Sequence, residues 1–407
     1  MMQLQFNLDT FISQSVTGRT ESLLYSDFKK HNAQMEERLN GKSVLVIGGA
    51  GTIGSSYIKA LLSFKIKKLV VIDINENGLT ELVRDLRSST GYNIPNEFIT
   101  YPVNFGDRVF EKIFKHNGTF DIVANFAAHK HVRSEKDIYS IEAMIENNVL
   151  RARKLLDLLL EYPPEHFFCV STDKAANPVN VMGASKKLME ELIMAYSSKI
   201  PIKTARFANV AFSNGSLPLG FLERLNKRQP FSCPRGIRRF FVSPQESGEL
   251  CLMATVMGET GDIFFPKLDE KKDMIPFDQI VKDLLNTLGL EVDVCYSDEE
   301  AKEKVLLWDE NSKSYPVYFF GSDTSGEKSF EEFYTDKEVL DLDSFLNLGV
   351  IKNSKKRDIK EIDEIFIRLH KLFDEETVSK SELVEVLKEY LPNFAHIETG
   401  KGLDSKM

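Results

Sequence analysis

The 407-residue chain has few cysteines and no long apolar run, and its 52 Lys and Arg residues are outnumbered by 61 Asp and Glu. No run approaches the roughly 18 apolar residues of a membrane span, and no apolar signal-peptide region opens the chain, so we expect a cytoplasmic protein. The net charge of -9, with no basic stripe, argues against nucleic acid as a partner. The few cysteines show no metal or disulfide spacing, and we expect buried free thiols at Cys169, Cys233, Cys251 and Cys295.

A glycine-rich turn follows the first clear strand pattern. The β-branched run Ser43–Ile47 leads into GGAGTIG at 48–54, and a helical pattern begins at Ser55. Glycine allows positive φ and close approach of the backbone to a pyrophosphate, which the helix N-terminus then binds. The strand–turn–helix context therefore predicts a dinucleotide site. Its predicted cofactor contacts are Gly48, Gly51, Thr52, Ile53 and Gly54.

The next strand pattern ends in an acidic residue. Lys68–Ile72 is followed by Asp73, 19 residues after Gly54. A carboxylate there accepts hydrogen bonds from both ribose hydroxyls of NAD and repels the 2′-phosphate of NADP. We therefore predict NAD as the cofactor.

Strands and helices continue to alternate, which predicts an α/β fold with a Rossmann-like doubly wound parallel sheet. Strand patterns at 98–103 and 120–126 end beside polar or small residues. Among these, the predicted cofactor contacts are Asn104, Phe105, Ala127 and Ala128. His129 and His131 share one side of an extended chain, but no third ligand has suitable spacing, so we expect no metal site.

The segment STDKAANPVNVMGASKK, at 171–187, follows the apolar strand pattern 167–170. It places polar side chains where a parallel sheet opens into its ligand crevice. Met182 and Lys186 are four apart and share one face of the helix that follows. Taken alone, a polar loop with a helix cap explains the segment as well as an active site does.

Beyond residue 208 the pattern changes to loops and short elements. We predict an N-terminal arm at 1–40, an NAD-binding domain at 41–208, and a smaller substrate-binding domain with a helical tail at 209–407, the chain being free to cross between the last two. Three arginines at 235, 238 and 239 form either a solvated turn or a clamp on a diphosphate. The segment 321–329 imitates a phosphate loop, but Glu327 breaks its G-K-[ST] motif, so we reject a kinase or ATPase.

From about Leu39 to Pro266 the chain resembles the extended short-chain dehydrogenase/reductases, and among them the nucleotide-sugar 4,6-dehydratases of bacterial polysaccharide biosynthesis. The resemblance rests on the motif at 48–54, AAHKHV at 127–132, the segment 171–186, RFANV at 206–210 and RRFFV at 238–242. It implies a C-terminal α+β domain that binds a nucleotide sugar. It also implies homodimers or higher oligomers built on helices such as 137–160 and 182–197.

The resemblance further implies a set of site residues. The catalytic set is Thr172, Asp173, Lys174, Met182 and Lys186, and the substrate contacts are Lys130, Asn209, Ser216 and Arg239. Methionine replaces the usual active-site tyrosine at position 182, as in the branch that dehydrates UDP-N-acetylglucosamine with retention at carbon 5.

These residues suggest a division of the proton transfers. Asp173 would accept the carbon 4 hydroxyl proton. Lys174 would be the carbon 5 base, provided that burial or Lys186 lowers its pKa. Lys186 would hold the nicotinamide ribose. A nucleotide-sugar 4-epimerase and a non-catalytic NAD-binding sensor are the alternatives.

Overall fold

The computed structural model describes residues 6–321, 331–352, 354, 356–375 and 377–396. The phosphate-loop-like segment, apart from Gly321, lies outside these residues. None of the described helices is both long and apolar enough to cross a membrane.

Among the described residues, nine strands form the central sheet, in the order β14-β15-β10-β6-β5-β4-β1-β2-β3. Strands β3, β2, β1, β4, β5, β6 and β10 pair in parallel, whereas β15 and β14 run antiparallel at one edge. The order 3-2-1-4-5-6 confirms the predicted Rossmann-like doubly wound sheet. The strand bounds are β1 Ser43–Ile47, β2 Lys68–Asp73, β3 Glu97–Pro102, β4 Ile122–Asn125, β5 His166–Val170, β6 Ile202–Ala205, β10 Ile263–Pro266, β14 Val339–Asp341 and β15 Leu348–Lys352.

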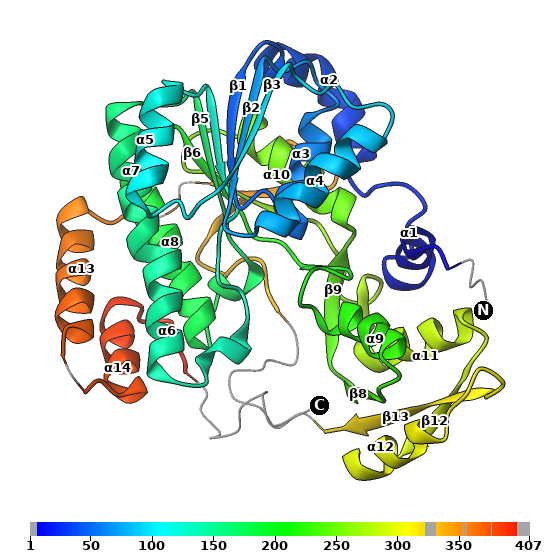
Figure 1. The fold of residues 1–407 in the computed structure, drawn as a ribbon. Helices are drawn as coiled ribbons and strands as arrows, with labels where there is room; N and C mark the ends of the chain where they lie inside the picture. The colour runs from blue at the N-terminus through cyan, green and yellow to red at the C-terminus, as the bar shows by residue number, and fades with distance from the viewer. Residues whose placement is uncertain (1–5, 322–330, 353, 355, 376, 397–407) are drawn as a thin grey trace.

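Helices cover both faces of this sheet, which explains why its central strands are almost continuously apolar. Figure 1 shows α5, α7 and α8 on one face and α3, α4 and α10 on the other. The helix bounds are α2 Tyr25–Leu39, α3 Thr52–Leu61, α4 Glu76–Ser88, α5 Arg108–Asn117, α6 Ile138–Ile145, α7 Arg151–Glu161, α8 Val181–Tyr196 and α10 Pro244–Met257.

A smaller α+β unit, also as predicted, surrounds a second apolar core. It contains two three-stranded sheets, β11-β9-β7 and β12-β13-β8, in the described part of the chain. Its elements are β7 Asn209–Val210, α9 Leu217–Asn226, β8 Phe231–Pro234, β9 Arg238–Val242, β11 Met274–Pro276, α11 Phe277–Thr287, β12 Glu291–Cys295, α12 Asp298–Leu306 and β13 Ser314–Phe320. Because β10, β14 and β15 return to the large sheet, residues beyond 208 build both units. The domain boundary at 208 stays a prediction.

The helical pattern predicted at 137–160 contains an irregular turn. Helices α6 and α7 are joined by a π-helical turn, η3 Glu146–Leu150. The wider turn buries both Asn147 and Asn148, and Asn148 then reaches across to neighbouring elements.

Of the two C-terminal helices, α13 Ile359–Phe373 lies beside α7 and α8, and α14 Lys380–Tyr390 packs against α13 (Figure 1). Arg153 on α7 donates to Asp363 on α13 at 2.8 Å, and Arg357 pairs with Glu191 on α8. The same chain thus packs against helices that the resemblance assigns to oligomer contacts. Homo-oligomer formation stays a prediction.

Candidate active site

The glycine loop after β1 is shaped by backbone packing. Gly48 has a φ of 76°, and a Cβ there would lie 2.5 Å from the amide nitrogen of Ala127. A Cβ at Gly54 would lie 2.2 Å from the carbonyl oxygen of Gly48. At Gly51, which precedes the first turn of α3, the nearest atom to a Cβ would be 3.5 Å away. Gly48 and Gly54 are therefore needed for packing, whereas Gly51 leaves open space where a phosphate can approach the helix N-terminus.

The predicted cofactor residues follow the carboxyl ends of the parallel strands. Asp73, at the end of β2, accepts hydrogen bonds from the backbone N–H groups of Ala50 and Asn75, both at 2.9 Å. Asn104 follows β3 and accepts from the Gly106 N–H at 2.8 Å, and the N–H of Ala127 after β4 donates to Asn125. Phe105 is buried and Ala128 lines the adjoining cavity. This arrangement fits NAD, although the individual contacts stay predictions.

A cavity of about 310 Å³ opens beside the glycine loop, within the size range of small-ligand sites. It brings together predicted residues from well-separated segments of the chain: Ile53, Ala128, Lys130, Thr172, Asp173, Lys174, Met182, Lys186, Asn209 and Ser216. Its apolar wall, which the sequence analysis missed, includes Leu217, Pro218, Phe241 and Phe277.

Asp173 is held in the cavity with one free carboxylate oxygen. Its Oδ1 accepts from Thr172 Oγ1 at 2.7 Å, from the Lys174 N–H at 2.9 Å and from Lys174 Nζ at 3.1 Å. Its Oδ2 has no hydrogen-bond partner among the described residues, although Asp173 is only 2% exposed. A buried oxygen without a partner is rare in folded proteins, and this one marks Asp173 as a candidate for the chemistry of the site.

Lys174 lies between two carboxylates. Besides Asp173, the Oε1 atom of Glu331 lies 3.8 Å from Lys174 Nζ. Burial lowers the pKa of Lys174, but the two carboxylates outweigh that effect and raise it above the ordinary lysine value. The expectation that the pKa of Lys174 is lowered is therefore wrong for the free protein. Glu331 lies far along the chain from the 171–187 segment, and no local pattern marked it.

Helix α8 carries the other two catalytic candidates. Asn180 caps it by accepting from the Gly183 N–H, and the Met182 N–H donates to Glu135 Oε1 at 2.8 Å. Met182, whose thioether is only a weak hydrogen-bond acceptor, lines the cavity where the resemblance expects tyrosine. Lys186 Nζ donates to the Val170 carbonyl at 2.6 Å, and burial lowers the pKa of Lys186.

Asn148 in the π-helical turn fixes the loop that follows β4. Its side chain exchanges two hydrogen bonds with the backbone of His129 and donates to Ser185 Oγ on α8. The chain after Ala128 is thereby held against the catalytic helix. Within the described part of the chain, no three His, Cys, Asp or Glu side chains gather as a metal site.

The three arginines on the substrate side make different contacts. Arg235 lies over the ring of Phe319, and Arg238 donates to the Met274 carbonyl. Arg239 is buried and donates to the Arg238 carbonyl, yet it lies near enough to Lys174 to counteract the rise in that lysine's pKa. Arg239 is not among the described residues that line the cavity. Its role as a diphosphate ligand stays a prediction.

Known proteins resemble this chain in sequence and in fold. A UDP-N-acetylglucosamine 4,6-dehydratase (inverting) of Campylobacter jejuni is 30% identical over 57% of this chain and 69% of the relative. A UDP-glucose 4-epimerase of Rickettsia typhi is 27% identical over 81% of this chain and 96% of the relative. The chain spans 47% of the probable polysaccharide biosynthesis protein EpsC of Bacillus subtilis, at 27% identity over 75% of this chain.

A solved UDP-glucuronic acid 4-epimerase mutant of Bacillus cereus, in complex with a UDP-sugar analogue and NAD, shares the fold with a TM-score of 0.52 at 19% identity. It aligns over 72% of this chain and 90% of that one. The profile of one protein family, described as "Polysaccharide biosynthesis protein", matches residues 44–352, which include every residue of the cavity named above. The chain belongs to this polysaccharide biosynthesis family.

Proposed function

We propose that this protein is an NAD-dependent nucleotide-sugar 4,6-dehydratase that acts on UDP-N-acetylglucosamine or a related nucleotide hexose. The observation that carries the proposal is the buried Asp173–Lys174 pair, with a free Asp173 Oδ2, beside methionine at position 182. The dehydratase among the relatives, the NAD bound in a protein of the same fold, and the open space at Gly51 support it.

Elimination of water across carbons 5 and 6 requires an acidic hydrogen at carbon 5. Oxidation of carbon 4 to a ketone makes that hydrogen α to a carbonyl. Bound NAD would supply the hydride acceptor, taking the hydride from carbon 4 and returning it to carbon 6. The chain itself must then move protons at carbons 4, 5 and 6, which needs two groups with separate roles.

Asp173 and Lys174 can take these two roles, and the proton transfers of the cycle then balance. Asp173 Oδ2 accepts the carbon 4 hydroxyl proton and later donates it to the oxygen that leaves carbon 6 as water. Neutral Lys174 accepts the carbon 5 proton, and returns it to carbon 5 when the hydride is transferred back to carbon 6. Protonation of Asp173 removes one of the two carboxylate charges that raise the pKa of Lys174. Lys174 thus becomes a stronger acid once carbon 4 is oxidised, and its 20% exposed side chain releases the resting proton to solvent and regains one from solvent after product release.

The alternative function is a nucleotide-sugar 4-epimerase, favoured by the relative that aligns over most of this chain. An epimerase returns the hydride to carbon 4 and needs no second acid–base group. It leaves the Lys174 pairing without a chemical role.

Incubation of the NAD-loaded protein with a panel of nucleotide sugars, followed by mass spectrometry, tests the proposal. A dehydratase produces a species lighter by one water. Epimerisation with no change of mass would overturn the proposal in favour of the alternative. Binding of NAD without conversion of any sugar in the panel would favour a non-catalytic sensor.

A further inference from the structure

The N-terminal segment 6–24, which we call the arm, precedes the part of the chain that the family profile matches. It begins with α1 Leu8–Phe11 and the π-helical turn η1 Ile12–Val16. The buried side chains Phe11, Ile12 and Val16 belong to the core of the smaller unit. Leu24, at the other end, belongs to the core of the large sheet. The arm therefore connects the two units directly, as its path in Figure 1 shows.

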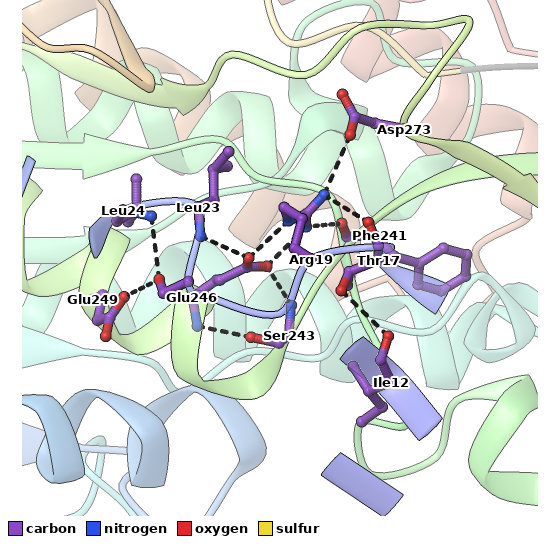
Figure 2. Close-up of polar contacts among 11 residues, drawn as sticks. Ile12, Thr17, Arg19, Leu23, Leu24, Phe241, Ser243, Glu246, Glu249 and Asp273 are labelled. Carbon is purple, nitrogen blue, oxygen red and sulfur yellow. Dashed lines mark hydrogen bonds and ion pairs between the residues drawn. The ribbon is translucent and has the colours of Figure 1, made fainter. Parts of the chain in front are cut away.

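Arg19 is the polar centre of this connection (Figure 2). Its Nε and one terminal nitrogen donate to the two carboxylate oxygens of Glu246, both at 2.8 Å. The same terminal nitrogen donates to the Phe241 carbonyl at 3.0 Å. The other donates to Asp273 and to the Thr17 carbonyl, both at 3.3 Å. All five N–H groups of the guanidinium thus have acceptors.

These acceptors belong to both sides of the active site. Glu246 lies in the first turn of α10, and Gly248 lets that helix approach α3 so closely that a Cβ would lie 2.2 Å from the Ser56 carbonyl oxygen. Helix α3 in turn begins at the glycine loop. Phe241 and Asp273, by contrast, lie on β9 and just before β11, in the smaller unit. One side chain therefore joins the cofactor side to the substrate side.

Phe241 is itself part of the wall of the active-site cavity. Its ring packs edge-to-face against Phe277 of the same wall, with the two ring centroids 5.9 Å apart. In the β7–β9 pair, Phe241 lies opposite Asn209, a predicted substrate contact. A shift of the Phe241 backbone would therefore move the wall and Asn209 together.

The arm makes a second contact, next to this wall, through Phe11. The Phe11 ring meets Phe212 edge-to-face at 5.8 Å. Phe212 has a φ of 53°, which is unfavourable for a bulky residue and persists only where neighbouring contacts hold it. Ser213, which lines the cavity, comes next in the chain.

Between these contacts the arm does not pack closely against α3. It partly encloses a second cavity of about 670 Å³, lined on the far side by Ser56, Lys59 and Tyr92. Apolar packing therefore acts at the two ends of the arm, and the hydrogen bonds of Arg19 hold its middle.

We propose that Arg19 is a positioning residue of the substrate site: it fixes the Phe241 wall relative to the cofactor loop without touching either ligand. The reaction that this wall serves rests on the function proposed above, but the positioning itself is a property of the ligand-free protein. Lysine cannot replace Arg19, because an ammonium has only three donors and no planar fork for the Glu246 carboxylate.

The test compares Arg19→Lys and Arg19→Met with a matched control, Arg153→Met. Arg153 has similar exposure, at 20% against 15%, and also pairs with a carboxylate of another element, but on the α7–α13 side of the molecule. Hydrogen–deuterium exchange of the ligand-free proteins is the first readout. We expect faster exchange at 209–216 and 238–242 in both Arg19 variants and unchanged exchange there in the control.

Kinetics with the nucleotide sugar that the wild-type protein converts is the second readout. A wall displaced by a fraction of an ångström should lower kcat/KM by about tenfold or more, chiefly through KM, with unchanged affinity for NAD. Arg19→Lys, which retains the charge, should do so with little change in Tm. Exchange at wild-type rates in both Arg19 variants, or a kcat/KM that falls only as far as in Arg153→Met, would overturn the proposal. If the wild-type protein performs no dehydration while the exchange result is as expected, only the proposed function is contradicted.

Discussion

Lys174 Nζ lies 3.8 Å from the carboxylate of Glu331, which a distant part of the chain brings to the catalytic segment. Glu331 is 7% exposed, so solvent screens its charge only weakly. Glu331 therefore favours the protonated form of Lys174, in opposition to the proposed role of Lys174 as a base.

Replacement of this carboxylate should shift the pH dependence of the reaction. Glu331→Gln removes a negative charge, so the pKa of Lys174 falls and its neutral form appears at lower pH. We expect the ascending limb of the kcat/KM profile, which reports the free enzyme, to move to lower pH. Glu332→Gln is the control, because exposed Glu332 contacts Asn177 instead. A shift of the descending limb would show that Lys174 acts as an acid.

Asp173→Asn should stop the first step of the reaction. The amide preserves the size of the side chain but cannot accept the carbon 4 hydroxyl proton. The rate of NADH formation in a single turnover should fall by about 10²-fold or more. Lys174→Ala should still form NADH and stall before water is lost, without solvent deuterium entering at carbon 5. NADH formation at the wild-type rate in Asp173→Asn would assign the first base to another residue.

The sequence predicted the parts of this site that local chemistry determines. The glycine loop, the residue ending β2 and the STDK segment each follow an apolar strand, and parallel strands bring their carboxyl ends to one edge of the sheet. Most of the predicted set therefore meets at one cavity. Glu331 and Arg19 lie outside such patterns, because their positions depend on how distant segments pack. The expected decrease in the pKa of Lys174 failed for the same reason, since the sequence did not reveal its second carboxylate.

Cofactor preference should depend on Asp73. The wild-type protein should bind NAD more tightly than NADP, because the carboxylate repels a 2′-phosphate. Asp73→Ser should reduce the difference between the two dissociation constants. It should also weaken binding of both cofactors, since the Ala50 N–H loses the acceptor that holds the glycine loop. Calorimetric titration of both cofactors checks this, and tighter binding of NADP by the wild-type protein would contradict it.

Gly54 should be needed for stability of the fold, and Gly51 for binding of the cofactor. Gly54→Ala places a methyl group against the Gly48 carbonyl and should destabilise the fold by about 1–3 kcal/mol or more. Gly51→Ala has room for its methyl group and should leave Tm nearly unchanged. Its methyl group should nevertheless crowd the pyrophosphate and weaken NAD binding. Thermal unfolding with and without NAD separates the two effects, and equal losses of Tm without cofactor would refute the distinction.

A buried ion pair behind the active site should make stability depend on pH. Glu190 on α8 accepts hydrogen bonds from Nε and one terminal nitrogen of Arg206, at 2.9 and 2.8 Å, and also from Ser171. Burial alone would raise the pKa of Glu190, but Arg206 and the other partners lower it from 4.5 to about 2. The ionised form thus stabilises the folded state above pH 4.5, and this contribution is lost as the pH falls towards about 2.

Arg206→Met should therefore be costly at neutral pH, by about 3–5 kcal/mol, because it leaves the buried Glu190 charge without its two-point partner and with only the longer Lys187 contact at 3.7 Å. The difference from the wild-type protein should shrink as the pH falls from 4.5 towards 2, where Glu190 becomes neutral in both proteins. Arg357→Met, which breaks the more exposed pair with Glu191, should cost about 1 kcal/mol or less. Urea unfolding across this pH range measures both variants. A difference for Arg206→Met that stays constant with pH would show that the Glu190 charge does not cause the loss.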